Sequence, residues 1–435
     1  MPGERAGPVL VDTSADAAGY FVLEELVPVG EPFLLVVRSG RFRRATVQTI
    51  PAASACTTVE LPVLVEDGNP TRLPRDLDDG LAAHIPRFAV ATGEYDASEC
   101  LLDVIGIDRE LFGHPSDDSA RVHLYRDNGA WSPAARACQQ CASTTSAAAR
   151  SCRELNCGGP EISDRTAFIA AQAHDVLFGT GARAPEYDAV IVGCRGDLSG
   201  APGTASRERL RRYLNRGGQI TAMHFADTWI TNGDSSYDPE APLATGTNAA
   251  VSYAAPRAGN FDGIGRIDAT RPQASPHINR FLTWALAAGV VSDPDDPTFP
   301  ISEPRSRAVT LGPHTHEYVH CEEGNCTATP APDMRRPHLV AFDTPYGAPV
   351  DAACGRAIYV GYHTVGGSAA FVFPQHCVGA LAEEDRSLLY PLLDAPPCAA
   401  APLEPPVCSP STTCAPGVCT PQPDGCGNVI PCDPC

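Results

Sequence analysis

Residues 187–227, YDAVIVGCRGDLSGAPGTASRERLRRYLNRGGQITAMHFAD, contain a strand, a helix and a second strand in succession. The apolar run YDAVIVGC predicts a buried strand, and SRERLRRYLNRGG predicts a helix. Gly217 and Gly218 mark the end of that helix, because glycine readily adopts the left-handed conformation found there. The strand QITAMHFA follows directly. Two strands joined by a crossover helix predict parallel pairing within one sheet.

Strands and helices also alternate on either side of this unit. Upstream, RFAVATGEYD (87–96) predicts an apolar strand ending at Gly93, and ASECLLDVIGID (97–108) predicts a helix. Further elements are predicted at ARVHLYRDNG (120–129), TAFIAAQAHDVLF (166–178), SPHINRFLTWALAAG (275–289), RAVTLG (307–312), PHLVAFD (337–343), GRAIYVGYH (355–363) and AEEDRSLLYPLLD (382–394). This order predicts an α/β fold with a parallel sheet and helices on both faces.

Composition narrows the functions open to the chain. Its 435 residues are 43% hydrophobic and 19% charged, which is typical of a globular protein. A net charge of −20 argues against a nucleic-acid partner, because phosphate binding requires a basic surface. The chain contains no lysine, which excludes Schiff-base chemistry, lysine-bound pyridoxal phosphate and a P-loop lysine.

The 18 cysteines indicate an oxidising compartment, because an even number clustered in Gly- and Pro-rich surroundings is typical of disulfides. Close pairs occur at Cys138/Cys141, Cys152/Cys157, Cys321/Cys326 and Cys354/Cys377, and six more lie in the last 28 residues, at Cys408, Cys414, Cys419, Cys426, Cys432 and Cys435. For the first two pairs, a zinc ribbon is the alternative to disulfides.

The amino terminus conflicts with export. The opening residues MPGERAGPVLVDT contain no apolar core of a signal peptide, and no stretch is long enough to span a membrane. We therefore expect the natural start to lie upstream, with the signal peptide missing from this sequence. On this interpretation the protein is extracytoplasmic: secreted, periplasmic or on the cell surface.

Residues 9–65 alternate apolar and polar side chains between glycines, which predicts strands and turns. The segment resembles the carboxypeptidase regulatory-like (transthyretin-like) β-sandwich, whose pattern is D-x-x-G-x-F-x-L, then L-x-P-G, then an alternating strand. The matching residues are Asp16, Gly19, Phe21, Leu23, Leu26, Gly30 and Leu34 to Val37. The family's opening strands have no counterpart, so the resemblance implies a partial sandwich.

Residues 87–394 resemble the ThuA-like branch of the class I glutamine amidotransferase-like, flavodoxin-like α/β domains. In that family a glycine-rich turn precedes a strand that ends in histidine, and a G-R-V strand ends in Gly-His. The matching residues are Gly217 and Gly218 before His224, and Gly355 and Arg356 before His363, with Tyr362 in place of the second motif's last glycine. The position of the amidotransferase nucleophile falls to His224, which cannot form a thioester, so glutamine hydrolysis is not expected.

Polar residues follow several of the predicted strands, where ligands of an open parallel sheet bind. The candidate catalytic residues are His224, His363, Asp197 and Glu94, and the other rim residues are Asp127, Arg195, Asp227 and His338. Such a set suits a divalent cation or general acid–base chemistry, although no cofactor is predicted outright. The alternative is that these side chains only cap loops and helices. For Cys194, a buried thiol or a disulfide to Cys398 is favoured over a nucleophile.

The segment HTHEYVHC brings His314, His316 and His320 close together in sequence. On a strand, His314 and His316 would share one face, as zinc ligands sometimes do. Because the segment precedes Cys321 and has the character of an exposed loop, surface histidines are favoured over a metal site.

These patterns divide the chain into five parts. They are a partial sandwich (1–66), a linker (67–86), a ThuA-like α/β domain (87–394) with a cysteine-bearing insertion near 137–163, a Pro/Ala linker (395–407) and a cysteine-rich tail (408–435). The tail resembles short repeats of secreted bacterial proteins. It needs disulfides because it is too small to form an apolar core.

Two functions are consistent with this organisation. The first is a secreted or cell-surface protein whose α/β domain has a binding or structural role and little or no catalytic activity. Its partner would be a carbohydrate or a cell-envelope component. The alternative, which the ThuA resemblance implies, is an extracytoplasmic enzyme that acts on a carbohydrate-like substrate at the rim formed by His224 and His363.

Overall fold

The chain forms two compact units, residues 5–398 and a second unit of residues 1–4 together with 399–435. The computed structural model describes residues 11–16, 19–24, 27–61, 69–127, 129–141, 148, 151–152, 175–179, 181–194, 204–230, 251–253, 263–272, 274–304, 308–321, 336–349, 352–364, 370–394, 422–423 and 429–430. The described part of the second unit is a two-stranded antiparallel sheet of β16 (Gln422–Pro423) and β17 (Val429–Ile430). All other described elements belong to the first unit.

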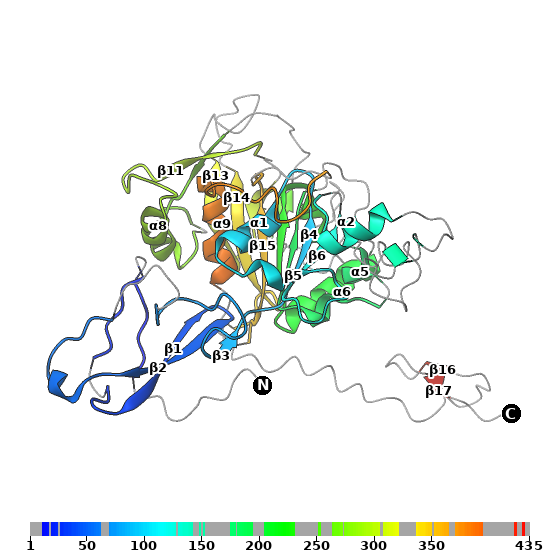
Figure 1. Cartoon of the computed structure of the whole chain (residues 1–435). Helices are drawn as coiled ribbons and strands as arrows, with labels where there is room; N and C mark the ends of the chain where they lie inside the picture. The colour runs from blue at the N-terminus through cyan, green and yellow to red at the C-terminus, as the bar shows by residue number, and fades with distance from the viewer. Residues whose placement is uncertain are drawn as a thin grey trace. The chain divides into compact units, whose positions relative to one another are not determined.

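A ten-stranded sheet is the centre of the first unit (Figure 1). In spatial order its strands are β11 (Thr298–Ile301), β10 (Gly263–Arg266), β13 (Thr315–Cys321), β14 (Pro337–Thr344), β15 (Gly355–Val360), β8 (Gln219–Met223), β7 (Ala189–Val192), β4 (Phe88–Thr92), β6 (Val122–Arg126) and β5 (Phe112–Gly113). The strands from β15 to β5 pair in parallel. With its helices, this sheet makes the unit an α/β fold, as the alternating pattern predicted.

The predicted parallel sheet is only part of the observed one, because the complete sheet is mixed. Strands β11, β10, β13, β14 and β15 pair antiparallel with one another in that order. Parallel neighbours require a crossover of about a dozen or more residues, whereas antiparallel neighbours need only a turn. The connection from β14 to β15, residues 345–354, is too short for a crossover helix, so β14 and β15 pair antiparallel.

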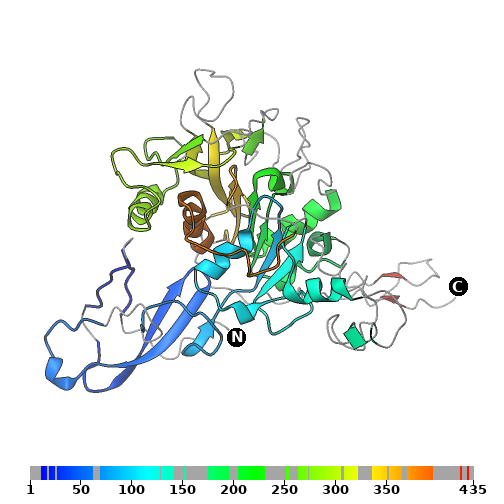
Figure 2. The ribbon, with the colours of Figure 1, turned by 45° about the horizontal axis from the view of Figure 1, so that its top comes forward.

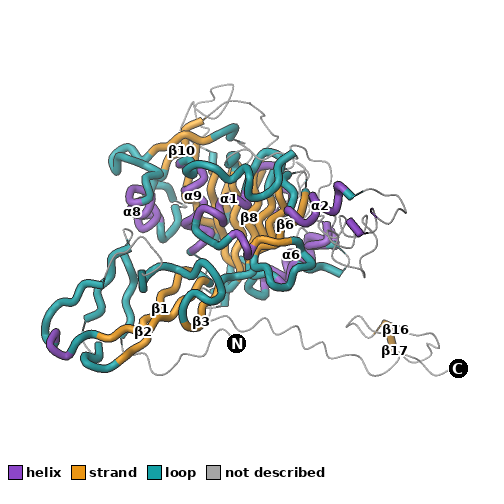
Figure 3. Tube along the Cα trace, viewed as in Figure 1, coloured by secondary structure: helices purple, strands orange, loops and turns teal. Residues whose placement is uncertain are grey.

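Helices cover both faces of the sheet (Figures 1 and 3). In β4, Phe88 and Val90 point into one core, and Ala89 and Ala91 point into the other. The first core takes side chains from α1 (Ser98–Val104), α8 (Ile278–Ala287) and α9 (Glu383–Leu393), and the second from α5 (Asp175–Phe178), α6 (Thr204–Asn215) and α7 (Asp227–Ile230). Burial on both faces explains why these strands are continuous apolar runs.

The histidine-rich segment that was expected to be an exposed loop is strand β13. It lies between β10 and β14, with Val319 opposite Leu339, so its backbone is hydrogen-bonded on both sides. His320 is only 1% exposed, His316 is half-buried, and His314, just before the strand, is exposed. The sequence of β13 is polar and does not look like an internal strand. The strand is buried because β10 and β14 lie on either side of it.

A separate three-stranded antiparallel sheet consists of β1 (Pro32–Ser39), β2 (Phe42–Thr49) and β3 (Leu81–His84). The β1–β2 hairpin is drawn in blue in Figure 2. Residues 81–84, within the expected linker, form the third strand. Arg41, in the hairpin turn, pairs with Asp188 next to β7, with Nη1 and Oδ1 2.9 Å apart. This ion pair connects the small sheet to the large one.

The remaining described elements are short. They are the 3₁₀ helices η1 (Ala52–Ser54), η2 (Arg109–Leu111), η3 (Ala184–Glu186) and η4 (His224–Ala226), the helix α2 (Pro133–Gln140), and a two-stranded sheet of β9 (Val251–Tyr253) and β12 (Ala308–Leu311). No helix within the described residues is long and apolar enough to cross a membrane.

The structure contains disulfides, as the cysteine pattern predicted. Cys141 is bonded to Cys152, and Cys138 is also disulfide-bonded, which overturns the zinc-ribbon alternative for this cluster. Cys321 and Cys354 are disulfide-bonded as well. Cys326, Cys157 and the six tail cysteines lie outside the described residues.

One pairing differs from the sequence-based expectation. Cys377 is bonded to Cys100, 277 residues earlier, and not to its neighbour in sequence Cys354, because the fold places the loop before α9 against α1. Cys194 is buried and is not in a disulfide, which agrees with the buried-thiol alternative and not with a disulfide to Cys398.

Candidate functional site

Four adjacent parallel strands, β15, β8, β7 and β4, end at the same edge of the sheet. A chemically reactive side chain follows each strand within a few residues: His363 after β15, His224 after β8, Cys194 after β7 and Asp96 after β4. All four residues are buried. Neighbouring strands therefore bring together side chains that are far apart in sequence.

The sulfur of Cys194 and the two imidazoles form a compact group. Cys194 Sγ lies 3.4 Å from His224 Nδ1. The rings of His224 and His363 are stacked, with centroids 4.0 Å apart. One donor atom from each of these three residues lies within 4.8 Å of the other two. The group is small enough for its three donors to contact a single ion.

Asp96 contacts both sides of this group. Its Oδ1 lies 3.1 Å from His363 Nδ1 and accepts a hydrogen bond from the backbone N–H of Thr364 at 2.9 Å. Its Oδ2 accepts a hydrogen bond from the backbone N–H of Cys194 at 2.8 Å. The carboxylate thus ties the ends of β15 and β7 together. With Nδ1 of His363 engaged by Asp96, Nε2 is the nitrogen left to face a ligand.

Two residues at the site have left-handed backbone conformations that are strained for side chains other than glycine. His224 has φ 47° at the first residue of η4, and Glu303 has φ 43°. Glu303 Oε2 lies 3.9 Å from His363 Nε2, and its side chain is 44% exposed. Strained backbone of this kind is frequent at functional sites, where the surroundings impose it.

Glycines allow the strand ends to approach one another closely. A Cβ atom at Gly93 would lie 2.5 Å from the carbonyl oxygen of Cys194, and one at Gly193 would lie 2.8 Å from the backbone nitrogen of Gly93. Neither position has room for a side chain. The placement of Cys194 beside Asp96 therefore depends on glycine at both positions.

The donor set suits a borderline transition metal such as Zn²⁺, which thiolate and imidazole ligands favour. With Zn–S of about 2.3 Å and Zn–N of about 2.0–2.1 Å, tetrahedral ligands place sulfur and nitrogen about 3.5 Å apart. The observed 3.4 Å between Cys194 Sγ and His224 Nδ1 matches this edge. The same distance also fits a thiol donating to an imidazole, as in a cysteine–histidine nucleophile pair.

The other predicted rim residues differ in burial and do not all lie at the cluster. Glu94 is exposed and Asp127 is half-buried beyond β6, whereas Asp227 is fully buried at the start of α7. Arg195 and Asp197 lie outside the described residues. His338 reaches the edge because β14 runs antiparallel to β15, so that its carbonyl oxygen accepts a hydrogen bond from the N–H of Gly361 at 2.6 Å.

The histidines of the β13 segment do not join this group. Neither of the metal-competent clusters found among the described residues includes His314, His316 or His320. Sequence reasoning instead missed Asp96, two positions beyond Glu94, and gave Cys194 a minor role. The signal for Asp96 was present in the segment GEYD, where it ends the loop between β4 and α1.

Comparisons with known proteins identify no family for the chain. No family model matches it, and no curated protein matches it. Among solved structures, a protein described as thua-like from Bacteroides uniformis aligns over 70% of this chain and 88% of its own, with 9% identity and a TM-score of 0.33. The β-galactosidase from Rahnella sp. R3 aligns over 52% of this chain and 27% of its own, with 12% identity and a TM-score of 0.25. TM-scores this low establish no shared fold, so the chemistry of the site follows from its own geometry.

Proposed function

We propose that the α/β unit carries a transition-metal centre of the zinc class, with Cys194, His224 and His363 as ligands. The observation that supports it best is the convergence of three buried donors within 4.8 Å. Asp96 then serves as the carboxylate that orients a metal-binding histidine, an arrangement common at zinc sites. Three protein ligands leave a fourth position for water or a substrate, as in catalytic zinc sites.

The centre belongs to an extracytoplasmic modular protein in this proposal. The disulfides within the first unit are compatible with export. The protein in this proposal consists of a partial regulatory-like sandwich, a ThuA-like α/β domain and a tail stabilised by disulfides among Cys408 to Cys435. The partner is a carbohydrate or a cell-envelope component.

Cobalt titration tests the metal centre. Co²⁺ added to the metal-free chain should produce a thiolate-to-cobalt charge-transfer absorption that Cys194→Ser abolishes. Cys56→Ser is the matched control, because Cys56 is also reduced but exposed. His224→Ala and His363→Ala should weaken binding by at least about tenfold, whereas His314→Ala should not. A cobalt spectrum that is unchanged by Cys194→Ser would contradict the proposal.

The second candidate is an enzyme that uses this centre on a carbohydrate-like substrate. Glu303 favours it, because a partly exposed carboxylate near His363 Nε2 could act on a metal-bound water. Incubation of the zinc-loaded chain with a panel of glycosides and acylated sugars, compared with Glu303→Gln, tests it. Hydrolysis that requires both the metal and Glu303 supports this candidate. If the zinc-loaded chain hydrolyses no substrate faster than the metal-free chain, the enzyme candidate is rejected and the metal centre is non-catalytic.

A further inference from the structure

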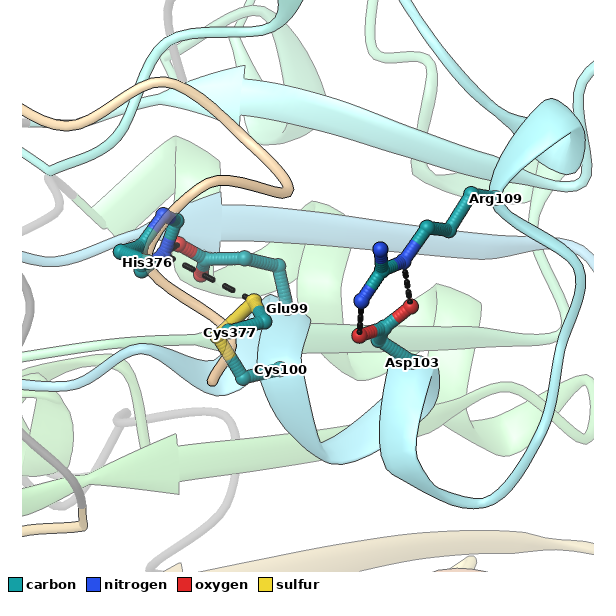
Figure 4. Close-up of a disulfide and its surroundings, with 6 residues drawn as sticks. All are labelled: Glu99, Cys100, Asp103, Arg109, His376 and Cys377. Carbon is teal, nitrogen blue, oxygen red and sulfur yellow. Dashed lines mark hydrogen bonds and ion pairs between the residues drawn. A yellow bond between two sulfur atoms is a disulfide. The ribbon is translucent and has the colours of Figure 1, made fainter. Parts of the chain in front are cut away.

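A second group of donors surrounds the disulfide between Cys100 and Cys377 (Figure 4). Glu99 and Cys100 are neighbours on α1, and His376 and Cys377 are neighbours on the loop before α9. Figure 4 shows the imidazole of His376 and the carboxylate of Glu99 meeting beside the sulfurs. Two elements thus each contribute one sulfur and one further donor.

The donor atoms of this group lie close together, and His376 is hydrogen-bonded to Glu99. His376 Nε2 lies 2.7 Å from Glu99 Oε1 and 3.9 Å from Cys377 Sγ. One donor atom from each of Cys100, His376 and Cys377 lies within 4.8 Å of the other two. All four residues are shielded from solvent, with the side chains of Glu99 and His376 only 1% and 5% exposed.

A disulfide with a purely covalent role requires no acid and no base beside it. Here a buried imidazole and a buried carboxylate adjoin the sulfurs, and each has a second polar atom, His376 Nδ1 and Glu99 Oε2, with no hydrogen-bond partner in the described part of the chain. The ring of Phe371 stacks on that of His376, with centroids 4.9 Å apart, and fixes its orientation. Buried polar groups normally find partners, so these two atoms are available to a further donor or ion.

We propose that reduction of this disulfide creates a second zinc-class metal site, with Cys100, Cys377, His376 and Glu99 as its four ligands. In the oxidised protein the two sulfurs are bonded to each other and cannot act as thiolates. A dithiol reductant breaks the Cys100–Cys377 bond, gives one hydrogen to each cysteine sulfur and leaves as a cyclic disulfide. Each thiol then loses a proton when the metal binds.

Metal binding replaces one link between α1 and the loop before α9 with another. The bidentate pair between Arg109 of η2 and Asp103, with bonds of 2.7 and 2.9 Å, links the far end of α1 to η2 and includes none of the four proposed ligands. The two groups share no residue, since the centre at Cys194 consists of Cys194, His224 and His363.

The experiment uses the full chain carrying Cys194→Ser, so that the outcome does not depend on the first centre. Co²⁺ binding is measured in the oxidised chain and, without oxygen, after reduction with a dithiol. The reduced chain should bind one more Co²⁺ with tetrahedral, thiolate-ligated absorption. His376→Ala and Cys377→Ser should each weaken this binding at least about tenfold. His314→Ala and Cys141→Ser are the matched controls and should leave it intact, because neither residue belongs to the group.

Equal cobalt binding by the reduced parent, His376→Ala and Cys377→Ser chains would overturn the proposal. A second measurement tests the proposal even if the chain partly unfolds when the disulfides are reduced. Alkylation of Cys100 and Cys377, mapped by mass spectrometry, should be at least about tenfold slower with Zn²⁺ than without it, and Glu99→Gln should reduce that protection. If Zn²⁺ protects neither cysteine, or circular dichroism shows the reduced chain unfolded with and without Zn²⁺, the proposed site does not exist.

Discussion

The imidazole of His363 stacks on that of His224, with ring centroids 4.0 Å apart and planes inclined by 29°. The two residues follow adjacent parallel strands, in which Val360 of β15 lies opposite Met223 of β8. The alignment of the strands brings the rings together, because parallel neighbours in register end at the same level of the sheet. Changes to the residues that support this edge should therefore alter ligand binding.

Asp96→Asn should weaken metal binding without removing a ligand. The carboxylate contacts His363 and accepts backbone hydrogen bonds from Cys194 and Thr364, so an amide loses part of this support. Loss of such an orienting carboxylate typically lowers metal affinity about 10–100-fold. Competition between the chain and a chromophoric chelator for Co²⁺ measures the affinity. Asp103→Asn is the control, since Asp103 of α1 pairs with Arg109 of η2 and not with the cluster; an equal loss in both variants would refute the role of Asp96.

Gly93→Ala should damage the site through the backbone. The added Cβ would lie 2.5 Å from the carbonyl oxygen and 2.9 Å from the nitrogen of Cys194, so one strand end has to shift. Overpacking of this kind costs about 1–3 kcal/mol of unfolding free energy. Urea denaturation should show the loss of stability, and cobalt titration should show weaker binding. Unchanged stability and affinity would mean that the strand ends are not packed as closely as described.

The two described disulfides should stabilise the fold unequally. Cys100 and Cys377 are separated by 277 residues, and Cys141 and Cys152 by 11. In the chain-entropy model, the longer loop should contribute about 2–3 kcal/mol more to the unfolding free energy, because it restricts the unfolded chain further. Guanidinium denaturation of the Cys100→Ala/Cys377→Ala and Cys141→Ala/Cys152→Ala chains compares them. Equal losses would count against the entropic explanation.

Because of His338, the free energy of unfolding should decrease as the pH is lowered from 6.5 to about 4. Burial lowers the pKa of His338 from 6.5 to about 4, although the hydrogen bond to the Arg336 carbonyl oxygen opposes this shift. Between about pH 4 and 6.5 the unfolded chain binds a proton that the folded chain excludes, so acidification favours unfolding, by at most about 3 kcal/mol. Above pH 6.5 both states are neutral and the contribution is fully present.

The variant His338→Gln checks this assignment, because glutamine can still donate to the carbonyl oxygen of Arg336 but does not titrate. Its unfolding free energy, measured by urea denaturation from pH 7 to pH 4, should decline less steeply than that of the parent chain. Parallel curves for the two chains would show that another group titrates, such as His123, whose pKa burial also lowers.

Much of the α/β architecture could be predicted from local patterns. The apolar runs became β4, β7, β8, β14 and β15, and the segments predicted as helices became α1, α6, α8 and α9. These elements are recognisable because a strand buried on both faces has to be apolar throughout. Strand β13 was missed, since a sequence of histidine, glutamate and tyrosine shows no such run.

The candidate site was predictable only in part. The rule that ligands bind beyond the carboxyl ends of parallel strands pointed to His224 and His363, and both lie in the cluster. The same rule selected Glu94, which is exposed, in place of Asp96, which is buried. Sequence spacing could not distinguish these two carboxylates, because the direction of each side chain depends on the turn between β4 and α1.

The order of strands and helices, the acidic charge, the absence of lysine and the abundance of cysteine are all properties of the chain itself, and they limit the fold class and the chemistry. Which cysteines bond, which strands pair antiparallel, and which four side chains meet at the edge of the sheet depend on contacts between distant residues. Cys100 bonds Cys377, and Cys194 stays reduced beside His224, because folding sets the distances between sulfurs and a disulfide forms only where they lie within bonding reach.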